Sequence, residues 1–521
     1  MKRIAGLTLV VLLVVTGAEA QQFTRISASE FAKDPAKVAA FRRAVQRMKE
    51  RNTRARTSAD FRQSWAYWAN THGYFGTGPR ASGSAAAFKA TARRRCAGFT
   101  GRLFTTCVSY YDHVQDFSVP NDGNITARVW GTCQHGNLQF LPWHRIYLKY
   151  FERTLRKFSG DPNFALPYWN YSDDTGPDDG VALPVMMRGT ATGNTLVDTF
   201  RTPGLNNNLS DIDPLDASAA QAFDFDVFTP FSQTLEGQPH GTMHCGTGTN
   251  CQAPDIGIVP VAGLDPVFYM HHANIDRLWQ CWMVRKANGA RIDLAWAKAN
   301  LGMPQSWFDQ SWSFVDENGR LVSMRVSQLF EPGGIDYVYD KVTDCVPEPP
   351  PQPERPAGDE LDTVTNVAPV ELRGRTLNVP LAPSTQEGPE RRLPEQVQVA
   401  PGRTVLLLQD VRVEGGNPGL TYRIYLSRRG DPSRRVYVAT IHWFGILHSH
   451  HEEHEGPDAA PGHRLLFYDV TDELGQLGNP SEADIAVSFE PTRGGEGRES
   501  PQPSASAGTV RVGSIRLQTA R

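Results

Sequence analysis

The chain has 521 residues, more than one hydrophobic core usually organises, so we expect two folded units. It carries 53 basic and 56 acidic residues, without a long basic stripe. This near-neutral balance offers no attraction for a phosphate backbone or an anionic membrane surface, which argues against nucleic acid or a membrane as a partner.

The first twenty residues have the pattern of an export signal. Lys2 and Arg3 precede an apolar stretch from Leu7 to Val15, and the small-residue exit Ala18-Glu19-Ala20 follows. The apolar stretch is shorter than the ~20 residues that a spanning helix needs, and no later segment approaches that length. We therefore predict a signal peptide over residues 1–20 and a mature protein that is exported, either periplasmic or secreted.

The front part of the mature chain, residues 21–345, is predicted to be mainly helical. Apolar residues recur at helical spacing over 35–51, 59–71, 143–158 and 271–286. Residues 346–360 are rich in proline, which favours an extended linker. Behind it, residues 361–521 contain short β-branched runs between glycine and proline turns, at 404–408, 422–426, 435–441 and 509–517. This pattern predicts an all-β sandwich as a second domain.

Seven cysteines in an exported chain suggest disulfides and one odd thiol. Two pairs would close short local loops, and a third would form a longer clasp; the pairs are Cys96 with Cys107, Cys245 with Cys251, and Cys281 with Cys345. Cys133 is then left unpaired.

Histidines gather in the front part at short spacings. His240 and His244 lie four residues apart, which on a helix places both rings on one face. His271 and His272 open an apolar helical pattern, and a further pair, His135 and His144, surrounds the start of another. Such a pair alone is more often a surface feature than a ligand set. Several clusters in one chain make coincidence improbable, because buried imidazoles otherwise each need a hydrogen-bond partner.

The residue types of these clusters indicate the class of metal. Neutral imidazoles suit copper, iron or zinc better than calcium or magnesium. The clusters lack the Glu-x-x-His pairs of carboxylate-bridged diiron sites. They also lack the four protein ligands, commonly cysteines, that complete the coordination of a structural zinc ion. Imidazole ligands for copper, iron or zinc therefore remain as the expectation.

Four segments carry a family resemblance: CQHGNLQFLPWHRIYLKYFERTLRKF, DPNFALPYWNYSD, GQPHGTMH and GLDPVFYMHHANIDRLW. They resemble the superfamily of tyrosinases, catechol oxidases and haemocyanins, whose helical bundle of four helices holds two copper ions. The resemblance implies that His135 and His144 bind the first copper, and that the second is bound by His240, His244 and His272.

Two histidines compete for the third position on the first copper. His72, in SWAYWANTHGYFG, resembles the ligand that ends an aromatic-rich helix in the family, whereas His113 has the spacing to His135 seen in several members. We favour His72 and interpret residues 75–129 as an insertion. By resemblance to fungal and molluscan relatives, Cys133 is expected to form a thioether with His135.

The resemblance also implies roles for residues around the metals. Glu236 corresponds to a glutamate that holds a water near the coppers and helps to remove a proton from an incoming phenol. Gly241 stands where several strongly hydroxylating tyrosinases have asparagine, which favours oxidation of diphenols. His271, Asn274 and Asp276 are expected beside the ligand rings, and Asp276 with Arg277 could equally form an ion pair on the helix surface.

The expected activity is oxidation of o-diphenols to o-quinones with O2, with monophenols as further substrates. Oxidation of o-aminophenols and reversible O2 binding are the alternatives, and Glu236 argues against the O2 carrier. WFDQSWSFVDENGRLVSMRV, the pair Tyr337 and Tyr339, and the rear part resemble the long, plant-like polyphenol oxidases. The resemblance implies a latent enzyme whose rear domain shields the copper entrance, activated by cleavage in the linker or by mild denaturant.

Overall fold

A computed structural model describes most of the chain between residues 22 and 520. The segments outside the description are 97–100, 173–179, 203, 209–211, 249–250, 252–254, 344, 347–363, 367, 384–396, 398, 400, 415–417, 419, 445–463, 482–483 and 493–507. The predicted signal peptide and nearly all of the predicted linker lie outside the described residues.

The front part is helical, as predicted. Its main helices are α2 (Pro35–Glu50), α4 (Trp65–His72), α8 (Phe140–Ser159), α10 (Phe228–Leu235), α11 (Thr242–Thr247) and α13 (Pro266–Ala287). A π-helical turn, η5 (Glu236–Gly241), joins α10 to α11. Shorter helices and 3-10 turns surround them: α1 (Ala28–Ala32), α3 (Ala59–Arg62), α5 (Ala85–Cys96), α6 (Gly101–Asp112), α7 (Ile125–Val129), η4 (Pro214–Ala217), α9 (Ala220–Phe223), α12 (Val259–Ala262), α14 (Leu294–Asn300) and α15 (Gln305–Asp309).

The helix ends differ from the predicted ones where a cap decides them. The segment predicted as one helix over 59–71 is two helices, because Ser64 caps α4 by accepting a hydrogen bond from the Tyr67 amide. The last predicted helix begins five residues earlier than expected, at Pro266. Asp265 caps it, and proline fits the first turn because that turn has no partner for an amide hydrogen.

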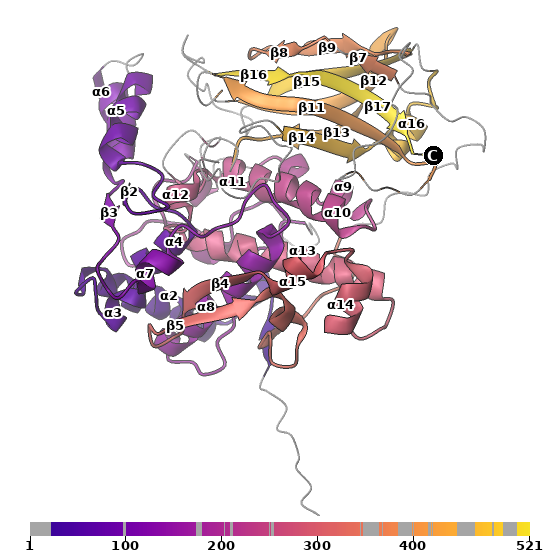
Figure 1. Ribbon diagram of the computed structural model, residues 1–521. Helices are drawn as coiled ribbons and strands as arrows, with labels where there is room; N and C mark the ends of the chain where they lie inside the picture. The colour runs from indigo at the N-terminus through magenta and orange to yellow at the C-terminus, as the bar shows by residue number, and fades with distance from the viewer. Residues whose placement is uncertain are drawn as a thin grey trace, which may run out of the picture.

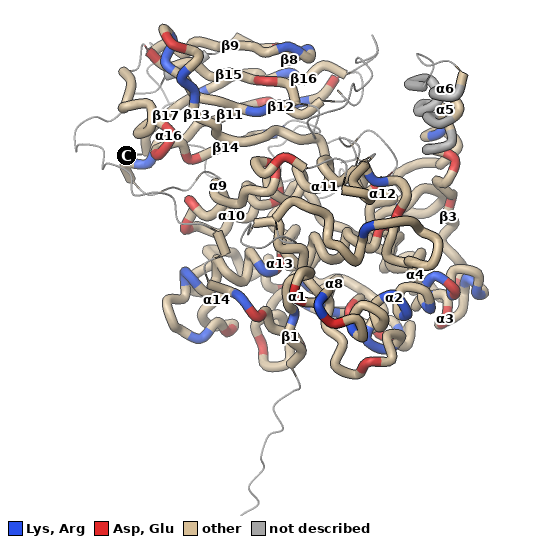
Figure 2. The backbone as a smooth tube through the Cα atoms, turned by 180° about the vertical axis from the view of Figure 1, so that it is seen from behind, with Lys and Arg blue, Asp and Glu red and all other residues tan. Residues whose placement is uncertain are grey.

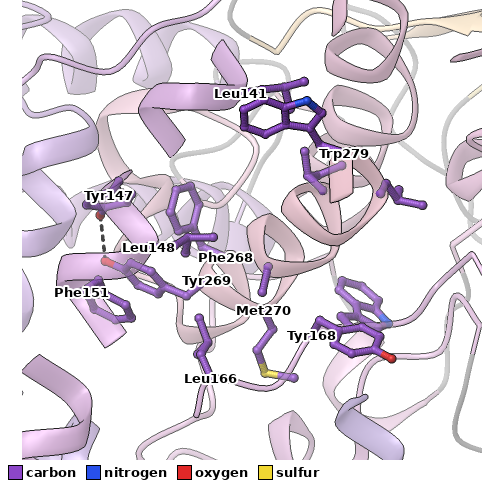
Figure 3. Packing of buried hydrophobic residues seen from close by; sticks show 14 of the residues in the cluster. Leu141, Tyr147, Leu148, Phe151, Leu166, Tyr168, Phe268, Tyr269, Met270 and Trp279 are labelled. Carbon is purple, nitrogen blue, oxygen red and sulfur yellow. Dashed lines mark hydrogen bonds between the residues drawn. The ribbon is translucent and has the colours of Figure 1, made fainter. Parts of the chain in front are cut away.

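The helices α8 and α13 form the centre of the front core. Figure 3 shows Tyr147 and Phe151 of α8 against Phe268 and Tyr269 of α13. The rings of Phe151 and Tyr269 stack at 3.6 Å, and the Tyr147 and Tyr269 hydroxyls are 3.2 Å apart. This packing holds α8 and α13 in place relative to each other. These helices carry His144 and the His271-His272 pair, so the core fixes the positions of these histidines.

The rear part is a sandwich of two antiparallel sheets, as predicted. One sheet contains β7 (Val364–Asn366), β8 (Val370–Leu372), β10 (Ala382–Pro383), β11 (Thr404–Glu414), β14 (Arg464–Asp469), β16 (Thr509–Val512) and β17 (Ser514–Thr519). The other contains β9 (Leu377–Pro380), β12 (Thr421–Arg428), β13 (Asp431–Ile441) and β15 (Ile485–Thr492). Inward-facing residues of both sheets, such as Leu406 and Ile424, share one core, and a short helix, α16 (Thr471–Gln476), follows β14.

Small strand pairs complete the front part. The strand β1 (Phe23–Arg25) pairs in parallel with β6 (Tyr337–Tyr339), so the beginning and end of the helical domain meet. The pair β2 (Gly76–Thr77) and β3 (Phe117–Ser118) and the hairpin of β4 (Ser311–Val315) and β5 (Leu321–Arg325) lie at its edges.

The sandwich lies over one side of the helical domain, with β13 and β14 nearest to α9, α10 and α11 (Figure 1). Gln238 of η5 connects the two domains: its side-chain oxygen accepts hydrogen bonds from the Thr440 amide at 2.9 Å and the Tyr437 hydroxyl at 3.2 Å. Within the described part of the chain, none of the helices has the length and apolar character required to cross a bilayer.

Candidate metal centre

The first histidine group is formed by His72, His135 and His144. His72 ends α4, His144 lies in the second turn of α8, and His135 comes from the loop before α8. Their ring centres form a nearly equal-sided triangle, with separations of 5.2, 5.4 and 5.8 Å. Backbone carbonyls hold two of the rings, because Nδ1 of His72 is 3.0 Å from the Val259 oxygen and Nδ1 of His144 is 2.8 Å from the Phe140 oxygen.

The second group contains four histidines. The ring centres of His240, His244 and His272 are 4.7, 5.0 and 5.3 Å apart. The chain bends at Gln238, whose backbone is extended inside η5, and this break directs His240 toward His244 of α11. Carbonyl oxygens again orient the rings, that of Glu236 at 3.0 Å from Nδ1 of His240 and that of Ile256 at 2.8 Å from Nδ1 of His244.

His271 belongs to this second group as closely as its neighbour does. Its ring centre is 4.6 Å from that of His244, and its Nδ1 is 3.0 Å from the Tyr171 hydroxyl. The sequence predicts His271 beside the ligands, and in the structure its ring lies in one group with those of His240, His244 and His272. His271 and His272 are adjacent in the N-terminal third of α13, and this part of the helix lies at the histidine groups.

The two groups adjoin each other. The rings of His144 and His272, one from each group, are parallel and 4.4 Å apart. Burial, together with the neighbouring rings, lowers the pKa of these two histidines well below the ordinary value. Burial likewise lowers the pKa of His72 to about 4. The imidazoles are therefore neutral at neutral pH, which is the form that binds metals.

The ring nitrogens fit a metal. Nε2 of His72, His240 and His271 is buried without a hydrogen-bond partner among the described residues, although Nδ1 of each ring has one. Nε2 of His244 and Nε2 of His272 are only 3.2 Å apart. For metal–nitrogen bonds of about 2.0–2.1 Å, this separation corresponds to an angle of roughly 100° at one shared ion. An unpartnered Nε2 on a ring whose Nδ1 is held by a carbonyl or a hydroxyl is the arrangement of metal-binding histidines.

Cys133 lies at the first group. Its sulfur is 3.6 Å from Nδ1 and 3.8 Å from Nε2 of His135, so it is nearly equidistant from both ring nitrogens. The same sulfur is 3.3 Å from Nε2 of His144. Burial is the main reason that the pKa of the Cys133 thiol is raised well above its usual value. The unpaired cysteine of the sequence is therefore in contact with the histidine to which the family resemblance would join it.

Glu236 connects the two groups. Its carboxylate accepts a hydrogen bond of 2.6 Å from the amide of Gly136, the residue after His135, while its carbonyl receives the His240 ring. Burial raises the pKa of Glu236 to about 7, against the opposing effect of Arg464. The carboxyl group is thus able to exchange a proton near neutral pH.

Asp276 and its neighbours hold helices together rather than touching the rings. Asp276 accepts hydrogen bonds from the hydroxyls of Tyr337 and Tyr339, both at 2.7 Å, and forms an ion pair with Arg145 of α8. Burial opposes its ionisation, but Arg145 and Arg25 keep the pKa of Asp276 below its ordinary value. The expected surface ion pair is therefore wrong, because Asp276 is buried.

Asn274 and Arg277 have a similar role on α13. The Asn274 oxygen accepts from Arg277 at 3.0 Å, and Arg277 donates to the Asn170 side chain at 2.7 Å. Arg277 therefore binds α13 to the loop that contains Asn170 and Tyr171. The Tyr171 hydroxyl contacts the His271 ring, so Arg277 orients this ring indirectly, by fixing the loop that carries Tyr171.

The other predicted residues have different outcomes. His113 stacks on Phe200 at 3.6 Å and is not part of either histidine group. Disulfides join Cys245 to Cys251 and Cys281 to Cys345, the pairing suggested by the sequence. The side chains of Cys96 and Cys107, on α5 and α6, lie outside the described residues.

The sandwich covers the metal centre with a residue that the sequence analysis missed. Phe444, just after β13, stacks on His244 with a centroid distance of 3.7 Å and an angle of 7°. It meets His135 and His240 edge-on, at 5.5 and 5.3 Å. The neighbouring Trp443 points the other way, into the core of the sandwich. The only sequence signal was an aromatic pair directly after a predicted strand.

His442 and Arg464 of the sandwich occupy the space where side chains would lie at two glycines of the helical domain. A side chain on Gly241 would collide with the His442 ring, and one on Gly136 would meet the Arg464 guanidinium at 2.6 Å. His442 also accepts a hydrogen bond of 3.1 Å from the Phe444 amide. Burial lowers the pKa of His442 to about 3, so the ring is neutral and able to accept that bond. The glycines are therefore complementary to the docked sandwich.

Comparisons with known proteins agree with this geometry. Residues 62–201 and 185–285 match the common central domain of tyrosinase, and residues 304–346 match the polyphenol oxidase middle domain. Tyrosinase HcTyr1 of Hahella sp. (strain CCB-MM4) is 24% identical over 479 residues, which cover 87% of this chain and 92% of that protein. The chloroplastic polyphenol oxidase of Malus domestica is 30% identical over 242 residues, which cover 40% of this chain and only 38% of the relative.

Solved structures share the fold of both domains. Latent apple tyrosinase matches with a TM-score of 0.56 and 18% identity over 97% of this chain and 98% of the other. Recombinantly expressed latent aurone synthase matches with a TM-score of 0.55 and 17% identity over 96% and 90%. The match to the central domain of tyrosinase includes every histidine of both groups, and the chain belongs to the tyrosinase and polyphenol oxidase family of dicopper proteins.

Proposed function

We propose that the protein is a copper-dependent oxidase that converts o-diphenols to o-quinones with O2. The observation that supports this most directly is the pair of adjoining imidazole groups, in which every ring except that of His135 is fully buried and backbone carbonyls hold four of the rings at Nδ1. His72, His135 and His144 would bind one copper, and His240, His244 and His272 the other. The copper pair supplies the redox chemistry, in which one O2 takes four electrons and four protons from two catechols and leaves as two waters.

The protein residues would orient the substrate and handle protons. A ring stacked on His244, where Phe444 now lies, would bring a phenolic oxygen to the edge of both groups. Glu236 lies beside that space and can take a proton near neutral pH, because burial raises its pKa to about 7. Gly241 offers no side chain to hold a second base or water next to His240, which favours diphenols over monophenols.

Two features of the centre are proposed from the family resemblance and supported by contacts. Cys133 would form a thioether with His135, with loss of one hydrogen from each partner and transfer of two electrons to the copper–O2 chemistry. His271 would orient the second site through Tyr171 rather than bind the metal. Its place among the second group makes it the first candidate if His272 is not the third ligand.

We further propose that the full-length enzyme is latent, because Phe444 occupies the approach to the histidines. Export through residues 1–20 and activation by cleavage within residues 346–357 stay predictions, since residues 1–20 and 347–357 lie outside the described residues. The test of the proposed function is metal analysis followed by O2 consumption. Copper-loaded protein should hold two coppers per chain and consume O2 continuously with 4-methylcatechol once the sandwich is displaced. Binding of O2 without turnover would instead indicate a carrier.

A further inference from the structure

A group of carboxylates lies at the boundary between the two domains, away from Phe444. Asp224 follows α9 of the helical domain and faces Asp469 and Asp472 of the sandwich. A single guanidinium, that of Arg403, stands among them, at 2.6 Å from Asp469, 3.7 Å from Asp472 and 4.0 Å from Asp224. Figure 2 shows acidic residues (red) on both sides of this boundary, at α9 and near β14 and α16.

Glu473 of α16 adds a fourth carboxylate to the same contact. Its side chain accepts a hydrogen bond of 2.8 Å from Gln221 of α9, so it connects the two domains directly. The other cation that faces Asp224 is Arg285 of α13. Three of the four carboxylates thus share Arg403, Arg285 also faces Asp224, and the contact cannot hold all four carboxylates in ionised form without strong repulsion.

Protons relieve this repulsion in the docked state. Burial raises the pKa of Asp224 to about 8, and Asp469 and Asp472 add to the shift while Arg403 and Arg285 oppose it. Burial likewise raises the pKa of Glu473 to about 8, with contributions from Asp224, Asp469 and Asp472. At neutral pH the docked contact therefore retains protons that the separated, hydrated carboxyl groups would release.

A second set of carboxylates, a pair on the helical domain, faces the sandwich elsewhere along the boundary. Asp213 and Asp216, at η4 of the helical domain, face Arg423 of β12, which forms an ion pair with Asp213. The Asp216 residue is only 4% exposed. Burial, followed by the charge of Asp213, raises the pKa of Asp216 to about 7, while Arg423 and Thr440 oppose the shift.

We propose that these two carboxylate sets form a proton-dependent latch, which holds the sandwich on the metal centre most tightly at acidic pH, weakens through neutral pH and is weakest at alkaline pH. Docking takes up protons, so it is fully favoured below the ordinary carboxyl pKa. It weakens as the pH rises toward the docked values of about 8 for Asp224 and Glu473. Each such group reduces the docking constant about tenfold per pH unit in that interval.

The latch is tested on the full-length, copper-loaded protein by amide hydrogen exchange at pH 6 and pH 9, corrected for the intrinsic exchange rate. Peptides that contain α9 and α16 should lose protection at pH 9 in the wild type. The double variant Asp224→Asn, Glu473→Gln should retain most of it, because neutral side chains keep the hydrogen bonds and do not ionise. Asp226→Asn, an exposed position on the same segment, should behave as the wild type.

Equal protection of the wild type at both pH values would overturn the latch, as would a double variant that opens as readily as the wild type. If the double variant does not fold, the single variant Glu473→Gln serves instead. Its loss of protection between pH 6 and pH 9, expressed as the logarithm of the protection factor, should be about half of the part that Asp224 and Glu473 together cause in the wild type. Only the consequence for catalysis, a rise in oxidase activity with opening, rests on the proposed function. An enzyme that opens at alkaline pH without oxidising catechol would refute that function and leave the latch intact.

Discussion

Replacing Phe444 with alanine should activate the full-length enzyme. The Phe444 ring is 4% exposed and stacks on His244 at 3.7 Å, so the variant removes both the cover over the histidines and part of the interdomain contact. Burial of a phenylalanine side chain contributes about 1.5–3 kcal/mol, and a stacked ring pair about 0.5–1.5 kcal/mol more. Because about 1.4 kcal/mol corresponds to a factor of ten, docking should weaken roughly 30- to 1,600-fold.

The assay is O2 consumption with 4-methylcatechol by full-length, copper-loaded protein without protease or detergent. Phe467→Ala is the matched control, because Phe467 of β14 is also buried between the domains, where it meets Phe225 edge-on at 5.7 Å. It should weaken docking without emptying the space over the histidines. We therefore expect the larger rate from Phe444→Ala.

The result that would refute this reasoning is a Phe444→Ala variant no faster than the wild type, with normal copper content and an unchanged circular dichroism spectrum. Such a result would mean that the sandwich excludes substrate by other contacts. A Phe467→Ala variant faster than Phe444→Ala would show that domain separation, rather than the ring over His244, controls access.

Three further experiments test the metal ligands, the thioether and the contact between the sandwich and the histidines. His72→Ala should reduce the copper content of dialysed protein from two to about one per chain, whereas His113→Ala should leave two; the opposite pattern would reverse the assignment. Mass spectrometry of copper-loaded protein exposed to O2 should find the peptide of Cys133 and His135 lighter by two hydrogens, and an unshifted mass after turnover would exclude the thioether. Gly241→Ala should displace His442 and raise the activity of the full-length enzyme, measured as O2 consumption. Gly237→Ala, where the nearest atom outside the segment is 4.0 Å away, should not; equal rates for both glycine variants would contradict the collision.

The sequence determined the class of each domain and the metal-binding character of the front part. Helical and alternating apolar patterns depend only on which face of an element is buried, so they are visible in the chain itself. The family resemblance of two short segments identified His240, His244 and His272 as ligands of one metal, whereas the sequence placed His271 only beside them. Caps such as Ser64 and Asp265 were present in the sequence as well, and they explain the helix ends that differed.

Only the tertiary structure decided which distant residues meet. It brought His72 rather than His113 to His135 and His144, because α4 packs against α12 and delivers its last residue to the Val259 carbonyl. It also placed Phe444 over the histidines and the carboxylates of α9 opposite those of α16. Contacts between domains leave no periodic pattern in a sequence, since each depends on the orientation of two independently folded surfaces rather than on local spacing.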